Sequence, residues 1–227
     1  MESKKKEKGE NALIKTYLVA YNVSQMLGWT ILLIIGVSQF FMKGQNSVYK
    51  EVNALLKIVQ TAAILEIVHC AVGFVRSNVL LTAIQVYSRV FVVWAVIHSV
   101  SIVQVNNGFL MLLLAWTVTE IIRYAFYFFS LLGKVPHFLV WLRYTLFIVL
   151  YPLGVTGELL VIWASLSYVE KTRMFSLDLP NQMNISFNFF YYLWFVMLMY
   201  IPLFPQLYLH MLTQRKKILG TARPKTE

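Results

Sequence analysis

The chain of 227 residues is 59% hydrophobic and only 13% charged, and its mean hydropathy is +0.64. Soluble domains carry about 25% charged residues, so this composition excludes an ordinary soluble enzyme and predicts an integral membrane protein. The net charge of +10 would suit a nucleic-acid-binding protein, but its distribution along the chain argues for the cytosolic face of a membrane instead. One cysteine, Cys70, excludes an internal disulfide.

In chain order, residues 1–15 form a basic tail and residues 213–227 form a second one. A helix needs about 20 mostly apolar residues to cross a bilayer. The stretches between the tails that meet this requirement are residues 16–42, 52–75, 79–100, 108–132, 138–166 and 189–212. The connections are short and rich in turn-forming residues, such as residues 43–47, and only the segment 167–188 is long. We therefore expect an all-α polytopic membrane protein with a bundle of six transmembrane helices over residues 16–212.

Lysine and arginine residues near the ends of the predicted spans indicate the orientation. With the N-terminus in the cytosol, twelve of these residues lie on the cytosolic side and four on the opposite side. Both termini are therefore predicted to be cytosolic. In this orientation Asn184, which begins an Asn-Ile-Ser glycosylation sequon, lies in the non-cytosolic loop and is a candidate glycosylation site.

Several polar side chains lie at bilayer depth, where charges are costly and usually face the interior of a bundle. They are Glu66 and His69 in the second predicted span, Gln85 and Arg89 in the third, Glu120 and Arg123 in the fourth, and Glu158 in the fifth. The two residues of each pair are three or four apart and share a helix face. Two interpretations stay open at this point: ion pairs that hold helices together, or the lining of a polar chamber.

The fifth predicted span contains the most informative spacing. Tyr151 and Glu158 are seven residues apart, so they share a face and are separated by about 10 Å of helical rise. Pro152 removes a backbone donor and favours a kink, and Gly154 is expected to leave a notch where a substrate approaches the backbone. Spacing alone allows either a kinked helix with small residues for packing or a pair of catalytic groups.

Segments along nearly the whole chain resemble the 3-hydroxyacyl-CoA dehydratase family, formerly called protein tyrosine phosphatase-like proteins. They are YLVAYNV at 17–23, LEIVHC at 65–70, QVYSRVF at 85–91, WTVTEIIRY at 116–124, RYTLF at 143–147, LYPLGVTGELL at 150–160 and YIPLFPQLY at 200–208. The resemblance implies dehydration of very-long-chain (3R)-3-hydroxyacyl-CoA to trans-2-enoyl-CoA, the third step of fatty acid elongation. By position it implies Tyr151 and Glu158 as the catalytic pair. The supporting positions that it implies are Glu66, Gln85, Arg89, Arg123 and Gly154.

The resemblance also implies the endoplasmic reticulum membrane and association with elongase and reductase enzymes of the same cycle. Removal of a C2 proton needs a base and loss of the C3 hydroxyl needs an acid, and the division of these roles between Tyr151 and Glu158 stays open. No metal or redox cofactor is expected, since CoA is part of the substrate. The acyl chain would lie among the helices in contact with membrane lipid. The CoA group would lie near the cytosol, where Lys134 and Arg143 are candidate basic contacts. Nucleic acid is not an expected partner.

Two other functions are weighed against this one. Residues 69–77, HCAVGFVRS, match the cysteine phosphatase pattern HC-x2-G-x2-R-S. A phosphatase loop directs free backbone N–H groups at a phosphate, whereas Cys70 lies late in an apolar span whose N–H groups are bonded within the helix. We therefore reject a phosphatase. A non-catalytic scaffold or transporter associated with the elongation complex stays as the alternative, and an activity assay separates it from a dehydratase.

Overall fold

The computed structural model describes residues 2–182 and 184–220, with side chains from residue 12 onward. Its elements are α1 (Glu2–Lys43), α2 (Gln45–Ala62), α3 (Ile64–Ala71), α4 (Val79–Phe91), the π-helical segment η1 (Val92–Ile97), the 3-10 segment η2 (Ser101–Val105), α5 (Asn107–Leu131), α6 (His137–Thr172) and α7 (Phe189–Gly220). In the described part of the chain, six helical segments are long and apolar enough to cross a membrane. The predicted all-α polytopic fold is confirmed.

The helices extend beyond the predicted spans at both ends of the chain. α1 begins at Glu2, within the predicted tail 1–15, and α7 continues to Gly220, within the predicted tail 213–227. Residues 221–227 of that second tail lie outside the described residues. Hydropathy marks where a chain enters the bilayer, whereas backbone hydrogen bonding continues into water wherever the residues allow a helix.

The second span differs most from its prediction. Its expected start at residue 52 and the expected connection over 43–47 are wrong, because α2 starts at Gln45 and only Gly44 separates it from α1. Gly44 has φ of 79°, a conformation open to glycine, and this lets the chain reverse in a single residue. The span is also interrupted at Ala63. Its carbonyl oxygen accepts a hydrogen bond of 3.0 Å from the amide of Glu66, three residues later, whereas an α-helix bonds residues four apart.

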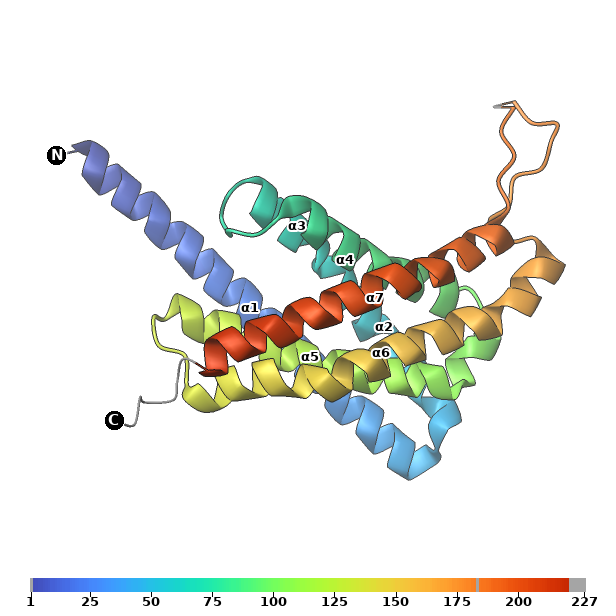
Figure 1. The fold of residues 1–227 in the computed structure, drawn as a ribbon, viewed down its shortest axis with the longest axis horizontal. Coiled ribbons are helices and arrows are strands. Elements are labelled where there is room, and N and C mark those ends of the chain that lie inside the picture. Colours follow the sequence, from blue (N-terminus) through green and yellow to red (C-terminus); the bar gives the residue numbers. More distant parts are fainter. Residues whose placement is uncertain (1, 183, 221–227) are drawn as a thin grey trace.

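The helix α5 lies at the centre of the bundle and packs against α1 on one side and α6 on the other, while α2 packs on α1 and α7 packs mainly on α6 (Figure 1). The core between these helices contains Trp29 from α1, Leu56 from α2, Leu112 from α5 and Ile162 from α6, all fully buried. No residue in the most apolar part of α7 is buried. α7 therefore forms an outer wall of the bundle.

The backbones of α5 and α6 approach closely where two glycines meet. A Cβ atom built on Gly157 would lie 2.6 Å from the amide nitrogen of Leu112 and 2.7 Å from the carbonyl oxygen of Gly108. A Cβ atom on Gly108 would lie 2.6 Å from the Cβ atom of Leu160. Small residues of this kind allow close helix packing in membranes, and here they fix the position of α5 beside the segment of α6 that carries Glu158.

The two ends of the bundle differ. The start of α1 and the end of α7 lie at one end, and the α6–α7 loop projects from the other (Figure 1). In that loop Leu177 and Phe187 form an antiparallel bridge with backbone hydrogen bonds of 2.7 and 3.0 Å. Asn184 lies exposed near the tip of this loop, with φ of 49°. The sequon thus lies in the loop, twelve residues after the end of α6 and five before the start of α7.

Candidate active site

Four of the charged residues that sequence places at bilayer depth form one continuous network. Arg123 of α5 makes two hydrogen bonds to Glu66 of α3, at 2.6 and 2.8 Å, and its Nε atom donates to Glu120 at 2.7 Å. Glu120 also accepts a hydrogen bond from Arg89 of α4. The two arginines and two glutamates alternate, so their formal charges cancel and each buried charge has an opposite partner.

Hydroxyl and amide groups complete the surroundings of Glu66. Tyr124 donates a hydrogen bond to its carboxylate, and the hydroxyl of Tyr21 lies 3.4 Å from the same oxygen atom. Gln25 donates to both tyrosine hydroxyl oxygens at 3.2 Å. Because α1, α3 and α5 all contribute, this part of the network connects three helices, as the structural interpretation of these residues expects. This observation does not exclude the interpretation of these residues as the lining of a polar chamber, since the network also reaches Glu158.

Glu158 is buried within α6, with 7% of its surface exposed, and both of its carboxylate oxygens accept hydrogen bonds. Trp116 of α5 donates to Oε1 at 2.9 Å, and the hydroxyl of Tyr200 on α7 donates to Oε2 at 2.5 Å. The guanidinium of Arg89 lies over the indole ring of Trp116, 5.6 Å from its centre. Glu158 is therefore held from two sides, and Trp116 connects it to the ion network.

Tyr151 lies two turns earlier on α6 and faces α7. Its ring stacks on Phe204 at 5.2 Å and lies parallel to the ring of Tyr208 at 6.3 Å between centroids. Its hydroxyl makes no hydrogen bond to any residue that the structure describes. Glu158 and Arg89 are both near enough to act on it electrostatically. The structure thus brings Tyr151, Glu158 and Arg89 into one region and leaves the phenol hydroxyl available to another molecule.

The other expected supporting residues are placed unevenly. Gly154 is buried against Ala115 and Trp116 of α5, so α5 fills the space beside it where the sequence suggested a notch for substrate. Gln85 is exposed on α4, and its side chain makes no hydrogen bond within the described residues, although it shares a helix face with Arg89. Lys134 is exposed in the α5–α6 loop, whereas Arg143 is partly buried near the start of α6.

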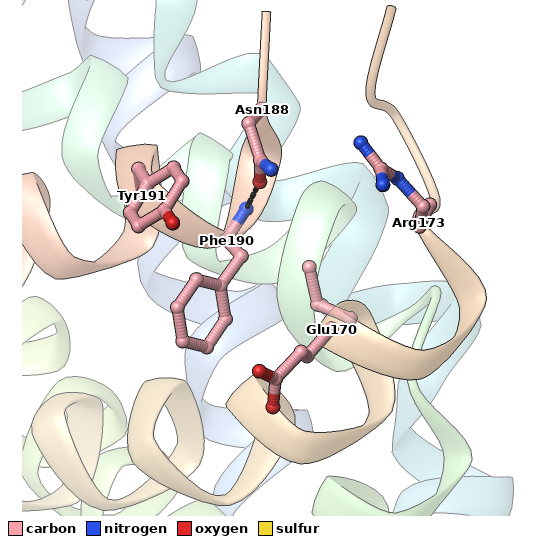
Figure 2. Close-up of a pocket in the computed structure, with 6 residues that line it drawn as sticks. Glu170, Arg173, Asn188, Phe190 and Tyr191 are labelled. Carbon is pink, nitrogen blue, oxygen red and sulfur yellow. Dashed lines mark hydrogen bonds between the residues drawn. The ribbon is translucent and has the colours of Figure 1, made fainter. Parts of the chain in front are cut away.

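A surface cavity lies away from these residues, at the end of the bundle that carries the α6–α7 loop (Figure 2). It has a volume of about 200 Å³, and Glu170, Arg173 and Asn188 are among the residues that line it. Asn188 uses its side-chain oxygen to accept a hydrogen bond from the amide of Phe190 at 3.0 Å. Glu170 is twelve residues from Glu158, about 18 Å along the helix, so this cavity is separate from the charged network.

The phosphatase-like segment has the opposite geometry to a phosphate-binding loop. Cys70 lies in the last turn of α3, and the amides of Val72 and Phe74 donate back to helix carbonyls at 2.9 Å each. A helix C-terminus presents carbonyl oxygens, which repel an anion. His69 bonds to the hydroxyl of Tyr17 at 2.8 Å. Across the described residues, no three histidine, cysteine or acidic side chains gather in a way that could hold a metal ion.

Trp116 and Tyr200 contact the most buried carboxylate of α6, yet sequence reasoning gave neither a role. Both residues fall within segments that carry the family resemblance, but aromatic residues are abundant in membrane spans and usually face lipid or the interface. One signal was present for Trp116, which precedes Glu120 by four residues and so shares a helix face with a buried acid. Tyr200 has no comparable neighbour in sequence.

Comparison with known proteins gives consistent matches. The model of the protein tyrosine phosphatase-like protein family, PTPLA, matches residues 60–221. The chain is 51% identical over 217 residues to very-long-chain (3R)-3-hydroxyacyl-CoA dehydratase 2 of Mus musculus, with 95% of this chain and 85% of the relative covered. It is 49% identical to the very-long-chain (3R)-3-hydroxyacyl-CoA dehydratase hpo-8 of Caenorhabditis elegans, with 94% of this chain and 99% of the relative covered. It is 39% identical to the very-long-chain (3R)-3-hydroxyacyl-CoA dehydratase PASTICCINO 2 of Arabidopsis thaliana, with 92% of this chain and 95% of the relative covered. No solved structure matches the chain significantly. The chain therefore belongs to the protein tyrosine phosphatase-like family, together with the very-long-chain (3R)-3-hydroxyacyl-CoA dehydratases.

Proposed function

We propose that this membrane protein dehydrates very-long-chain (3R)-3-hydroxyacyl-CoA to trans-2-enoyl-CoA, with Glu158 and Tyr151 as the base and the acid. One observation carries the proposal. Glu158 is a buried carboxylate held by hydrogen bonds at both oxygens, in a chain that is 39–51% identical to relatives named as dehydratases of this substrate. A carboxylate fixed in this way inside an apolar span indicates a function beyond helix packing.

The hydrogen bonds suggest how the two roles are divided. The indole N–H of Trp116 can only donate, and Glu158 accepts from it and from Tyr200. We therefore assign the base to Glu158, which takes the C2 proton and leaves the electron pair of the C–H bond on the thioester as an enolate; this pair forms the new double bond when the C3–O bond breaks. Tyr151, whose hydroxyl makes no hydrogen bond to the described residues, donates its proton to the departing C3 hydroxyl, and water leaves. The resting state returns when the proton on Glu158 passes to the Tyr151 phenolate.

The surrounding residues have supporting roles in this scheme. Arg89 lies over Trp116 and acts electrostatically on both Tyr151 and Glu158, so we assign it to balancing the negative charge that moves between them. Glu120 and Arg123 hold Arg89 in place through the ion network. The thioester carbonyl supplies the activation of the C2 proton, so the scheme uses no metal or redox cofactor.

A location and partners are part of the same proposal. The chain is a multi-pass membrane protein. We propose that it lies in the endoplasmic reticulum membrane with both termini in the cytosol, and that it works with the elongase and reductase enzymes that make its substrate and use its product. The α5–α6 loop, which contains Lys134, and the start of α6, which contains Arg143, lie at the proposed cytosolic end of the bundle (Figure 1), where the CoA group would be bound.

The test is an assay of purified protein in detergent with a long-chain (3R)-3-hydroxyacyl-CoA and detection of the enoyl product. General acid–base groups contribute about 10²–10⁴-fold to rates, so Tyr151→Phe and Glu158→Gln should each lower kcat by that order. Tyr191→Phe, an exposed tyrosine at the opposite end, is the matched control and should keep wild-type activity. Wild-type protein that forms no enoyl product, or full activity in both site variants, would refute the proposal and leave a scaffold or transporter.

A second measurement tests the division of roles. In deuterated water, a base that removes the C2 proton can return deuterium to the substrate before the hydroxyl leaves. Tyr151→Phe should therefore still exchange deuterium into the substrate at C2, whereas Glu158→Gln should not. Exchange that survives in Glu158→Gln and disappears in Tyr151→Phe would reverse the assignment.

A further inference from the structure

Among the residues that the structure describes, Arg143 has no counter-ion, although it lies in a membrane-spanning helix. Its Nε and Nη1 atoms are buried and have no hydrogen-bond partner, and its Nη2 atom makes only a long bond of 3.5 Å to the hydroxyl of Tyr127. It takes part in none of the ion pairs formed by the described residues. Arg123, by contrast, is bonded to two carboxylates. A buried guanidinium that lacks a carboxylate is costly unless an anion completes it.

Aromatic rings lie against this guanidinium. Its central carbon lies 4.3 Å from the ring centre of Phe126 and 4.9 Å from that of Tyr127. Such contacts stabilise a cation without accepting conventional hydrogen bonds from it, so the Nε and Nη1 donors of Arg143 stay available. The rings fix the orientation of Arg143 and leave its donors for another partner, as in sites where arginine binds phosphate with paired hydrogen bonds.

A cavity of about 120 Å³ adjoins Arg143 between α5, α6 and α7. Its polar lining comes from Arg143, Arg123 and Thr119, and its remaining lining is apolar: Ile122, Leu142, Leu146, Phe147, Leu150 and Met211. A water molecule occupies about 30 Å³ of the liquid, so the space is large enough for a phosphate group. One turn beyond Met211 on α7, Arg215 also has a buried Nε atom without a partner. No acidic residue lines the cavity, so its field favours an anion.

We propose that Arg143 anchors a subsite for a phosphate ester, and that the phosphate belongs to the CoA part of the substrate; this inference rests on the proposed function. Arg143 precedes Tyr151 by eight residues, about 12 Å along α6. The cavity includes Leu150, the residue next to Tyr151, so it extends from the unpaired arginine toward the reacting groups. A substrate with its thioester near Tyr151 would direct its phosphate-bearing arm along α6 to this arginine.

Binding is measured with ligands that cannot react, so that the result does not depend on catalysis. Palmitoyl-CoA and phosphate-free palmitoyl-pantetheine are titrated into the full-length protein in detergent, as wild type, Arg143→Gln and Arg143→Lys. The matched control is Lys171→Gln, which removes an exposed charge from the opposite end of the same helix. Phospholipid retained through purification is quantified by its phosphorus content, because a lipid headgroup carries the same phosphate chemistry.

A hydrogen bond to a charged group contributes enough for about a tenfold change in affinity. Arg143→Gln should weaken palmitoyl-CoA binding about tenfold or more, leave palmitoyl-pantetheine unchanged and keep the thermal stability of the wild type. Arg143→Lys, which keeps the charge without the paired donors, should bind palmitoyl-CoA with intermediate affinity, and Lys171→Gln should match the wild type.

Equal weakening of both ligands by Arg143→Gln, or no weakening of either, would overturn the proposal. Loss of bound phospholipid with unchanged palmitoyl-CoA affinity would also overturn it and assign the site to a lipid headgroup. Failure of the proposed function is seen in the activity assay instead: the wild-type protein would bind palmitoyl-CoA but form no enoyl product.

Discussion

Alanine substitutions at Gly157 and Gly154 form a matched pair, since each adds one methyl group on the same helix, a turn apart. At Gly157 the added carbon would lie 2.6 and 2.7 Å from backbone atoms of α5, which cannot move without separating the helices. At Gly154 the nearest neighbour is the Cβ atom of Ala115 at 3.4 Å, an ordinary contact. The same change in volume therefore meets rigid backbone at too short a distance at Gly157 and only an ordinary van der Waals contact at Gly154.

Overpacking in a protein core costs about 1–3 kcal/mol, and replacing a helical glycine by alanine gains up to about 1 kcal/mol in helix propensity. Because the neighbours of Gly157 are backbone atoms, we expect Gly157→Ala to lower the free energy of unfolding by about 2 kcal/mol. Gly154→Ala should leave it unchanged or raise it by up to about 1 kcal/mol. The separation of α5 from α6 in Gly157→Ala should also withdraw Trp116 from Glu158 and lower kcat.

The assay is thermal unfolding of the purified variants in detergent, followed by size-exclusion chromatography with fluorescence detection, with dehydratase activity measured beside it. One kcal/mol corresponds to roughly 2–4 °C in a chain of this length, so Gly157→Ala should unfold several degrees below Gly154→Ala. Equal unfolding temperatures for the two variants would refute the close crossing of α5 and α6. If Gly154→Ala folds normally and yet loses activity, the loss comes from the site and not from stability.

Three further predictions concern other residues. Tyr200→Phe removes one of the two hydrogen bonds to Glu158 and should lower kcat about tenfold with little change in KM; unchanged kcat would show that this bond does not support catalysis. Arg123→Gln leaves the carboxylates of Glu66 and Glu120 without their shared partner and should destabilise the protein by about 3–5 kcal/mol, seen as a large drop in unfolding temperature; a stable variant would show that the network is dispensable. Asn184 should carry an N-linked glycan in cells, detected as a gel shift on glycosidase treatment that Asn184→Gln abolishes. If a reagent confined to the cytosol modifies a cysteine introduced into this loop, the predicted orientation is reversed.

The number of spans and the inward-facing polar residues within them were predictable, because both depend on the cost of placing polar groups in hydrocarbon. Glu66, Arg89, Glu120 and Arg123 were expected to face inward, and the structure joins them in one network. That Arg123 bonds both glutamates could not be deduced, since the pairing depends on how three helices approach. The boundaries near Gly44 were missed because turn-forming residues indicate a reversal but not its length.

The candidate site was predictable only along a single helix. Spacing places Tyr151 and Glu158 on one face of α6, but it contains no information on which residues of other helices face them. Trp116 and Tyr200 reach Glu158 from α5 and α7, through contacts between residues 42 positions apart in each case. The space at Gly154 was misjudged for the same reason, because the neighbour that fills it comes from α5.

The alternation of Arg89, Glu120, Arg123 and Glu66 has a consequence for the energetics of a reaction inside the membrane. The four formal charges sum to zero, so an ionised Glu158 adds a single negative charge to this network. Taking a proton from the substrate then moves one negative charge a short distance from the carboxylate to the substrate oxygen, and no new charge is created in a medium of low dielectric constant. The bundle thus keeps a constant total charge through the proton transfer, which removes the largest electrostatic obstacle to acid–base chemistry in hydrocarbon.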